Sequence, residues 1–181
     1  MIPPGSYNFG PSNGQMRVKV YREGFAKKAG HDLIMVVDQW NAQAQIADDP
    51  AQTSITLSAM VDSMEVREGV GGVKPLSSGD KADIKKNIQK KILDSSSYPE
   101  ITFRSTSIQV MGNRATVRGD LTIMGRANPI DINLTDEGGK IKATTTVNHQ
   151  SQWGIKQFTA FMGALKVRDA IEIEIEATVP H

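Results

Sequence analysis

An alternation of apolar and polar residues recurs in many short segments of this chain, and it constrains the fold more than any other feature. The clearest case is near the C-terminus, where Ile171, Ile173 and Ile175 alternate with glutamates. A period of two places the isoleucines on one face of a β-strand, so that face can be buried while the glutamates stay in water. The same pattern recurs in residues 15–22, 40–46, 54–62, 100–108, 115–123, 129–135 and 140–147, and residues 33–37 form a continuous apolar run.

One-sided strands with short connections predict an antiparallel sheet. The pattern gives about eight such strands, and an open sheet of that size would leave two unpaired edges. Closing the sheet removes both edges, so we expect a mainly β fold in which an antiparallel eight-stranded β-barrel forms a single domain over residues 1–181. A sandwich of two sheets is the alternative architecture. A barrel of this size either fills its interior with its own side chains or holds one slender ligand.

One segment has the period of a helix instead. Ile84, Ile88 and Ile92 recur every four residues, which predicts one main α-helix over about 80–93 with an apolar face to bury against the sheet. The preceding residues 66–79 are rich in glycine and include Pro75, so we expect them to form a flexible loop. They lack the Gly-Lys-Ser/Thr sequence of a phosphate-binding loop.

Composition excludes several classes of function. The chain has 21 Lys and Arg residues against 20 Asp and Glu residues, and a net charge of +1 gives no electrostatic case for nucleic acid or for an anionic membrane surface. It has no cysteine, which excludes disulfides and thiolate chemistry. No apolar run approaches the roughly 20 residues of a membrane span. No signal peptide is visible at the N-terminus, so we expect a cytoplasmic protein, or a periplasmic or secreted one if the chain is a processed form.

Nothing in the sequence predicts a catalytic or metal site. His31, His149 and His181 are scattered without metal-ligand spacing. We interpret His31 beside Asp32 as a hydrogen-bonded imidazole at the start of a strand, and an acid–base role for this pair on a small apolar substrate stays open. The expectation is a protein that is not an enzyme and has no cofactor.

The apolar faces of the strands allow either a packed core or a cavity. Small residues on those faces leave space at the centre of the barrel; they are Ala42, Ala44, Ala59, Ala115, Gly119 and Ala143. Large, adaptable side chains are suited to a cavity wall. The candidates for ligand binding are Met35, Trp40, Leu57, Phe103, Leu121, Ile123, Trp153, Phe158, Phe161, Met162 and Ile173. A hydrocarbon chain in such a cavity gains about 0.8 kcal/mol per buried methylene.

Residues 80–134 also carry a family resemblance. The helix end Ile92-Leu93-Asp94, the segment Ser97-Tyr98-Pro99-Glu100-Ile101-Thr102-Phe103-Arg104-Ser105-Thr106, and Gly119-Asp120-Leu121-Thr122-Ile123-Met124-Gly125 with Pro129-Ile130 resemble the YceI-like family. The resemblance implies a lipocalin-like barrel that binds a polyisoprenoid lipid, with the head group near one mouth. Candidates for contact with a charged head are Lys27, Lys28, Lys74 and Arg126, all in expected loops or turns.

Two functional hypotheses follow. The first is non-enzymatic binding, transport or storage of an amphiphilic apolar lipid, such as a prenyl quinone or a prenyl phosphate, inside the barrel. The alternative is a stress-related structural or interaction domain, whose barrel is filled and whose partner is another protein. A homodimer formed through a sheet edge or through residues 66–79, or an exposed apolar patch, would favour this second hypothesis.

Overall fold

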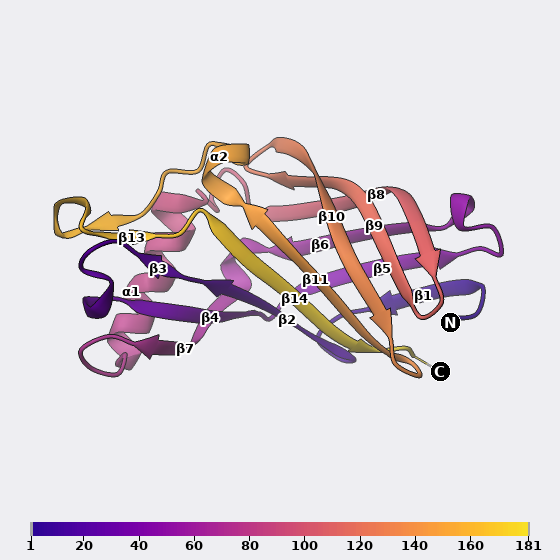
Figure 1. The fold of residues 1–181 in the computed structure, drawn as a ribbon, viewed down its shortest axis with the longest axis horizontal. Helices are drawn as coiled ribbons and strands as arrows, with labels where there is room; N and C mark the ends of the chain where they lie inside the picture. Colours follow the sequence, from indigo (N-terminus) through magenta and orange to yellow (C-terminus); the bar gives the residue numbers. More distant parts are fainter. Residues whose placement is uncertain (1, 181) are drawn as a thin grey trace.

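The computed structural model describes residues 2–180 of the chain. Eleven antiparallel strands form one large curled sheet in the order β1-β5-β6-β8-β9-β10-β11-β14-β2-β4-β7 (Figure 1). The bounds of these strands are β1 Gly5–Phe9, β2 Gly14–Val20, β4 His31–Val37, β5 Trp40–Ile46, β6 Ser54–Met60, β7 Met64–Gly71, β8 Glu100–Met111, β9 Arg114–Ile123, β10 Arg126–Asp136, β11 Lys140–Asn148 and β14 Ala170–Thr178. The mainly β, antiparallel prediction is therefore confirmed.

The predicted count of eight strands is not met, because the chain turns corners. It passes from β1 to β2, from β4 to β5 and from β6 to β7 through residues 10–13, 38–39 and 61–63. Across the first two corners the pairing is reciprocal, since β1 pairs with β5 while β2 pairs with β4. The corners bend the sheet into a half-barrel, and in the described part of the chain its end strands β1 and β7 do not pair with each other.

The prediction of a flexible loop over residues 66–79 is wrong for its first half. Residues Met64–Gly71 form β7, which pairs with β4 at one end of the sheet. Gly69 accepts the close approach of Leu76 and His31, and a side chain at this position would clash with Leu76. Glycine here therefore reflects tight packing at the edge of a sheet rather than flexibility. Only residues 72–77 connect β7 to the helix that follows.

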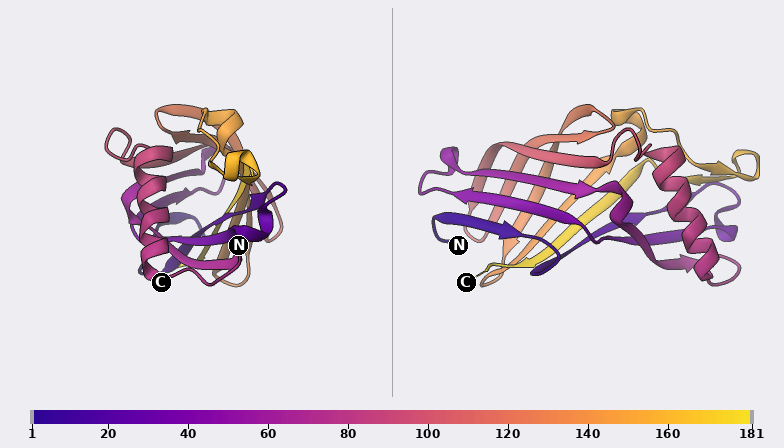
Figure 2. Two further views of the ribbon diagram at one scale, coloured as in Figure 1. Left: turned by 90° about the vertical axis from the view of Figure 1, so that its left-hand side faces the viewer. Right: turned by 180° about the vertical axis from the view of Figure 1, so that it is seen from behind.

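The main helix is confirmed. Helix α1 spans Ser78–Asn87 and continues as a π-helical turn, η4, over Ile88–Ile92. Ser77 caps its start: the Ser77 Oγ accepts a hydrogen bond from the Asp80 backbone N–H, and the Asp80 carboxylate accepts one from the Ser77 N–H. At the other end the Leu93 N–H donates to the Ile88 carbonyl oxygen at 2.9 Å. The helix packs along β7 and covers one side of the half-barrel (Figure 2).

A second, small sheet and several short helices complete one end of the molecule. The strands of this small sheet are β3 Arg22–Glu23, β12 Thr159–Ala160 and β13 Leu165–Val167, in the order β12-β13-β3. The short helices of the chain are η1 Lys27–Ala29, η2 Pro50–Gln52, η3 Val61–Ser63, α2 His149–Trp153 and η5 Phe161–Gly163. Strands β3 and β13 and helix α1 lie together at this end (Figure 1).

The hydrophobic core lies on the concave side of the sheet. Its buried members include Trp40, Phe103, Val117, Leu121 and Val147, and the isoleucines of α1 and η4 pack against it. No helix within residues 2–180 is long and apolar enough to cross a membrane.

Candidate ligand-binding site

A cavity of about 280 Å³ lies between helix α1 and the inner face of the sheet. Its walls include two strands with an alternating sequence, β2 and β14, and the continuous apolar run of β4. Val18 and Val20 of β2, Leu33 and Met35 of β4, and Ile171 and Ile173 of β14 all line it. Because these residues are two apart along their strands, they point to the same side of the sheet, and the wall is almost entirely hydrocarbon.

The helix supplies the opposite wall. Ile84, Ile88, Ile92 and Leu93 line the cavity from α1 and the π-helical turn η4. The wider π turn inserts one residue into the helical repeat, so Ile92 and Leu93 are rotated relative to a regular helix. The three isoleucines are only partly buried, whereas Leu93 belongs to the buried core. This wall is a single helix, and its main packing partner is β7.

Positive charge is gathered at one end of the cavity. Arg22, Lys156 and Lys166 line it there, next to the small sheet, together with the imidazole of His31. The Arg22 guanidinium donates to the Gly30 carbonyl oxygen, and its backbone N–H donates to the Asp32 carboxylate at 2.9 Å. These contacts hold Arg22 in place at the opening. We call this end, formed by residues 22–32, 72–76 and 154–168, the mouth.

His149 adds a polar group to the apolar wall. It lines the cavity and is 8% exposed. Burial lowers the pKa of its imidazole, so the ring is neutral at pH 7. Its Nδ1 atom has no hydrogen-bond partner within residues 2–180. The histidine therefore contributes no charge to the site.

The mouth segment 154–168 is fixed at both of its ends. Trp153 is 1% exposed, and its indole N–H donates to the Leu121 carbonyl oxygen at 3.1 Å. At the far end, the Asp169 carboxylate accepts hydrogen bonds from the Gln150 N–H and the Ser151 hydroxyl, both at 2.8 Å. Partial burial opposes ionisation of Asp169, but these hydrogen bonds outweigh it and lower its pKa. The segment between these anchors carries Phe158, Lys156 and Lys166 to the cavity.

The ligand-binding residues predicted from sequence lie in four places. Met35, Leu121, Ile123, Phe158 and Ile173 line the cavity. Trp40, Phe103 and Trp153 are buried outside its lining, and Phe103 with Leu57 lies at a second, more open and more polar hollow of about 730 Å³. Phe161 and Met162 project from the mouth and are 64% and 108% exposed.

None of the four predicted head-group residues lines the cavity. Lys27 and Lys28 are exposed on η1, and Lys74 is exposed in the connection from β7 to α1. The Lys74 carbonyl oxygen, rather than its ammonium group, contacts the site, at 2.7 Å from His31 Nε2. Arg126 is exposed at the start of β10, against Gly154.

Sequence reasoning missed Arg22, Lys156 and Lys166. Lys156 and Lys166 lie in a stretch without a clear period, where no strand face could be assigned. Arg22 ends the alternating run of residues 15–22 in phase with Met16, Val18 and Val20, but one arginine at the end of an apolar face did not indicate an opening. A signal was nevertheless present, because the aperiodic residues 154–168 contain cations and aromatic residues but no Asp or Glu.

The arrangement of His31 and Asp32 bears on the enzymatic hypothesis. That hypothesis requires both side chains to point into the cavity. His31 lines it, but the Asp32 carboxylate instead accepts the backbone N–H of Arg22 and is not part of the lining. Within residues 2–180 no three His, Cys, Asp or Glu side chains come together as metal ligands.

Comparison with known proteins identifies the fold. A family model described as the YceI-like domain matches residues 7–179. The crystal structure of BcnA from Burkholderia cenocepacia is similar, with a TM-score of 0.63 and 20% identity over 93% of this chain and 98% of that chain. The YceI protein of Campylobacter jejuni has a TM-score of 0.54 and 14% identity, over 81% of this chain and 85% of its own.

A third similar structure is a polyisoprenoid binding domain from Saccharophagus degradans that is implicated in plant cell wall breakdown. It has a TM-score of 0.53 and 8% identity, over 98% of this chain and 100% of that chain. At these identities the likenesses show a shared fold. No protein among those with curated descriptions matches the sequence.

Proposed function

Because this chain belongs to the YceI-like family, a membership that confirms the resemblance in residues 80–134, we propose that it binds an apolar lipid in the cavity beneath α1. The lipid is a polyisoprenoid, and the protein carries or stores it without catalysis. The observation that carries the proposal is an apolar cavity whose only cluster of charge, among the described residues, is cationic and lies at one opening. The polyisoprenoid-binding domain of similar fold supports the same class of ligand.

The cavity suggests how the ligand would lie. The hydrocarbon would run between the isoleucines of α1 and η4 on one side and the strand residues Leu33 and Ile173 on the other. The head group of the lipid would face Arg22 and Lys166. A volume of about 280 Å³ is near the lower end of the roughly 300–1,000 Å³ of ligand pockets. The site therefore favours a short prenyl chain, or a longer one whose end stays outside.

The charge at the mouth favours a prenyl phosphate over a prenyl quinone. Arg and Lys side chains give charge-assisted hydrogen bonds to phosphate oxygens, roughly twice as strong as neutral ones. A quinone carbonyl would bring no negative charge to Lys156 and Lys166. The filled-barrel alternative has less support, because the structure contains a cavity at the place where the helix meets the sheet.

The first test is to extract the natively purified protein with organic solvent and identify the lipids by mass spectrometry. The stripped protein is then titrated with farnesyl phosphate and with farnesol. We expect a bound prenyl lipid and a tighter complex with the phosphate. In the double variant Lys156→Gln/Lys166→Gln, the ratio of affinities for farnesyl phosphate and farnesol should fall about tenfold, since each phosphate contact is charge-assisted.

Lys140→Gln is the matched control, because Lys140 is an exposed lysine at the start of β11 and does not line the cavity. It should bind both ligands as the wild type does. The proposal is rejected if no lipid copurifies and the stripped protein binds neither compound.

A further inference from the structure

Large apolar side chains project from the mouth instead of packing into it. Phe25 and Met162 are 104% and 108% exposed, and Val73 is 85% exposed. They come from three separate segments. The Ala26 N–H donates to the Ala164 carbonyl oxygen at 2.9 Å, which ties the loop of Phe25 to the loop of Phe161 and Met162. We call Phe25, Val73, Phe158, Phe161 and Met162 the mouth patch.

The backbone beneath part of this patch is unusual. Phe161 and Met162 have φ angles of 50° and 57°, in the left-handed region that L-residues with large side chains disfavour. The pairing of Thr159 with Lys166 and of Ala160 with Leu165 closes the loop and holds this conformation. The fold thus displays two large apolar side chains against the local preference of the chain. Such retained strain is typical of functional positions.

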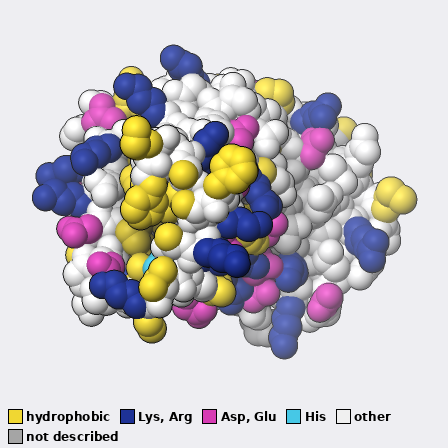
Figure 3. All heavy atoms as spheres, turned by 60° about the vertical axis from the view of Figure 1, so that its left-hand side comes forward, with side chains coloured by type: hydrophobic (Ala, Val, Ile, Leu, Met, Phe, Trp, Pro, Cys, Tyr) yellow, Lys and Arg dark blue, Asp and Glu magenta, His cyan; other side chains and the backbone are white. Residues whose placement is uncertain are grey.

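Lysine and arginine surround the mouth patch. The three segments of the mouth contain Arg22, Lys27, Lys28, Lys74, Lys156, Lys166 and Arg168, while their only acidic residues are Glu23 and Asp32. Asp32 is paired with Arg22, and Glu23 accepts a hydrogen bond from Gln157. The whole chain has a net charge of only +1, so its positive charge is concentrated here. Hydrophobic side chains with Lys and Arg beside them are visible on this face (Figure 3).

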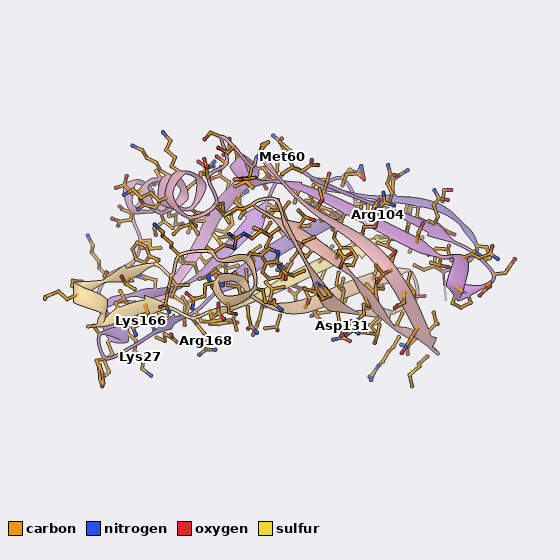
Figure 4. The ribbon with its side chains drawn as sticks, turned by 90° about the horizontal axis from the view of Figure 1, so that it is seen from above. Lys27, Met60, Arg104, Asp131, Lys166 and Arg168 are labelled. Atoms are coloured by element: carbon orange, nitrogen blue, oxygen red, sulfur yellow. The ribbon has the colours of Figure 1, made fainter. Side chains whose placement is uncertain are left out.

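Lys27, Lys166 and Arg168 lie in the left half of Figure 4, toward the end of the molecule that carries the small sheet. Exposed apolar side chains ringed by cations are the arrangement by which proteins bind the interface of an anionic bilayer. A second copy of the chain fits less well, because two such mouths face to face would bring like charges together. We propose that the mouth patch docks on an anionic lipid bilayer, so that the cavity opens toward the membrane from which its ligand comes.

This inference rests on the proposed function for its purpose, but its test does not depend on the cavity. The measurement is co-sedimentation with vesicles of phosphatidylcholine alone and of phosphatidylcholine with phosphatidylglycerol. We expect binding to the anionic vesicles that weakens in 0.5 M salt, as screening requires. The double variant Phe25→Ser/Met162→Ser should bind them at least about tenfold more weakly, since it removes two apolar side chains that the proposal buries in the bilayer.

A matched control lies at the opposite end of the molecule. Met111 ends β8 and is 79% exposed, so Met111→Ser removes a comparable exposed side chain and should leave vesicle binding unchanged. For charge, Lys27→Gln/Lys28→Gln should weaken binding to anionic vesicles several-fold, with Lys140→Gln as control. Since none of these residues lines the cavity, every variant should retain the lipid content of the wild type.

A variant that narrows the cavity separates the two proposals. Ile84→Trp on α1 should lower lipid content but leave vesicle binding intact, because Ile84 lines the cavity and lies outside the mouth patch. Wild-type protein that carries lipid but ignores anionic vesicles would overturn the docking proposal alone. Equal vesicle binding by the wild type and by Phe25→Ser/Met162→Ser would overturn it too. So would a wild-type protein that does not bind vesicles but forms a dimer that the double variant abolishes.

Discussion

Gly119 shows how one missing side chain can shape the interior of a half-barrel. A Cβ atom at this position of β9 would clash with the ring of Phe103 and with the Arg104 carbonyl oxygen. The space that glycine leaves is therefore occupied by an aromatic ring from β8, which pairs with β9. At Gly119 a large neighbour fills the space that was expected to stay open, and none of the six small residues lines the cavity.

Substitution Gly119→Val should therefore destabilise the protein by about 3 kcal/mol, at the upper end for overpacked cores, because both the ring and the backbone oppose the new side chain. The free energy of unfolding in urea measures the effect. Gly79→Ala is the control, since only Ser77 approaches that position within 4 Å and the residue lies in the first turn of α1. It should be neutral or stabilising by roughly 0.5–1 kcal/mol. Equal stability of the two variants would contradict this account of Gly119.

At the scale of elements, the cavity depends on how α1 is held. The helix contributes a whole wall, but its main packing partner is the end strand β7. Two further contacts fix it there: Lys85 forms an ion pair with Glu65, and the Lys81 ammonium donates to the Arg67 carbonyl oxygen at 2.8 Å. A helix attached to the last strand of a sheet can move with little cost to the remaining pairs. The capping box at its start is therefore important for the shape of the site.

The variant Ser77→Ala should lower the free energy of unfolding by about 1 kcal/mol, because it removes the acceptor for the Asp80 N–H at the helix start. It should also weaken binding of a prenyl ligand, since the wall formed by α1 is less firmly held. Ser78→Ala, one residue later, is the control and should be close to neutral, because Ser78 is not the capping residue. Thermal unfolding and ligand titration of both variants test this. Equal losses of stability and of ligand affinity in Ser77→Ala and Ser78→Ala would refute the role of Ser77.

At the scale of the whole molecule, the curled sheet depends on a seam between the two ends of the chain. Strand β2 pairs with β14 over residues 14–19 and 172–177, which are far apart in sequence. On the outside of this seam the Glu174 side chain is 13% exposed and accepts contacts from Arg17 at 2.8 Å and Lys142 at 3.0 Å. The hydrogen bond from Lys142 is the main reason that the pKa of Glu174 is lowered, although partial burial opposes it.

Replacing Glu174 by Gln should cost roughly 1 kcal/mol of stability at pH 7, since it breaks a small network rather than one isolated pair. A carboxyl group with a lowered pKa in the folded state stabilises the fold above its unfolded pKa of about 4.3, and the contribution disappears as the pH falls through the lowered value. The difference between Glu174→Gln and the wild type should therefore vanish in strong acid. Glu176→Gln, on the same strand but 48% exposed, should change stability by less than about 0.5 kcal/mol. A constant difference from pH 7 to pH 2 would contradict this explanation.

Periodicity is enough to predict the local structure: the strands with a period of two, the helix with its row of isoleucines, and which face of each is apolar. These features follow from contacts between near neighbours. The apolar faces predicted in this way include the cavity residues Met35, Leu121, Ile123 and Ile173. Only the tertiary structure decided that β7 is a strand, that corners divide the sheet into eleven segments, and that Arg22, Lys156 and Lys166 meet at one mouth. The physical reason is that pairing between distant segments sets which apolar faces enclose space, and no periodicity within one segment contains that information.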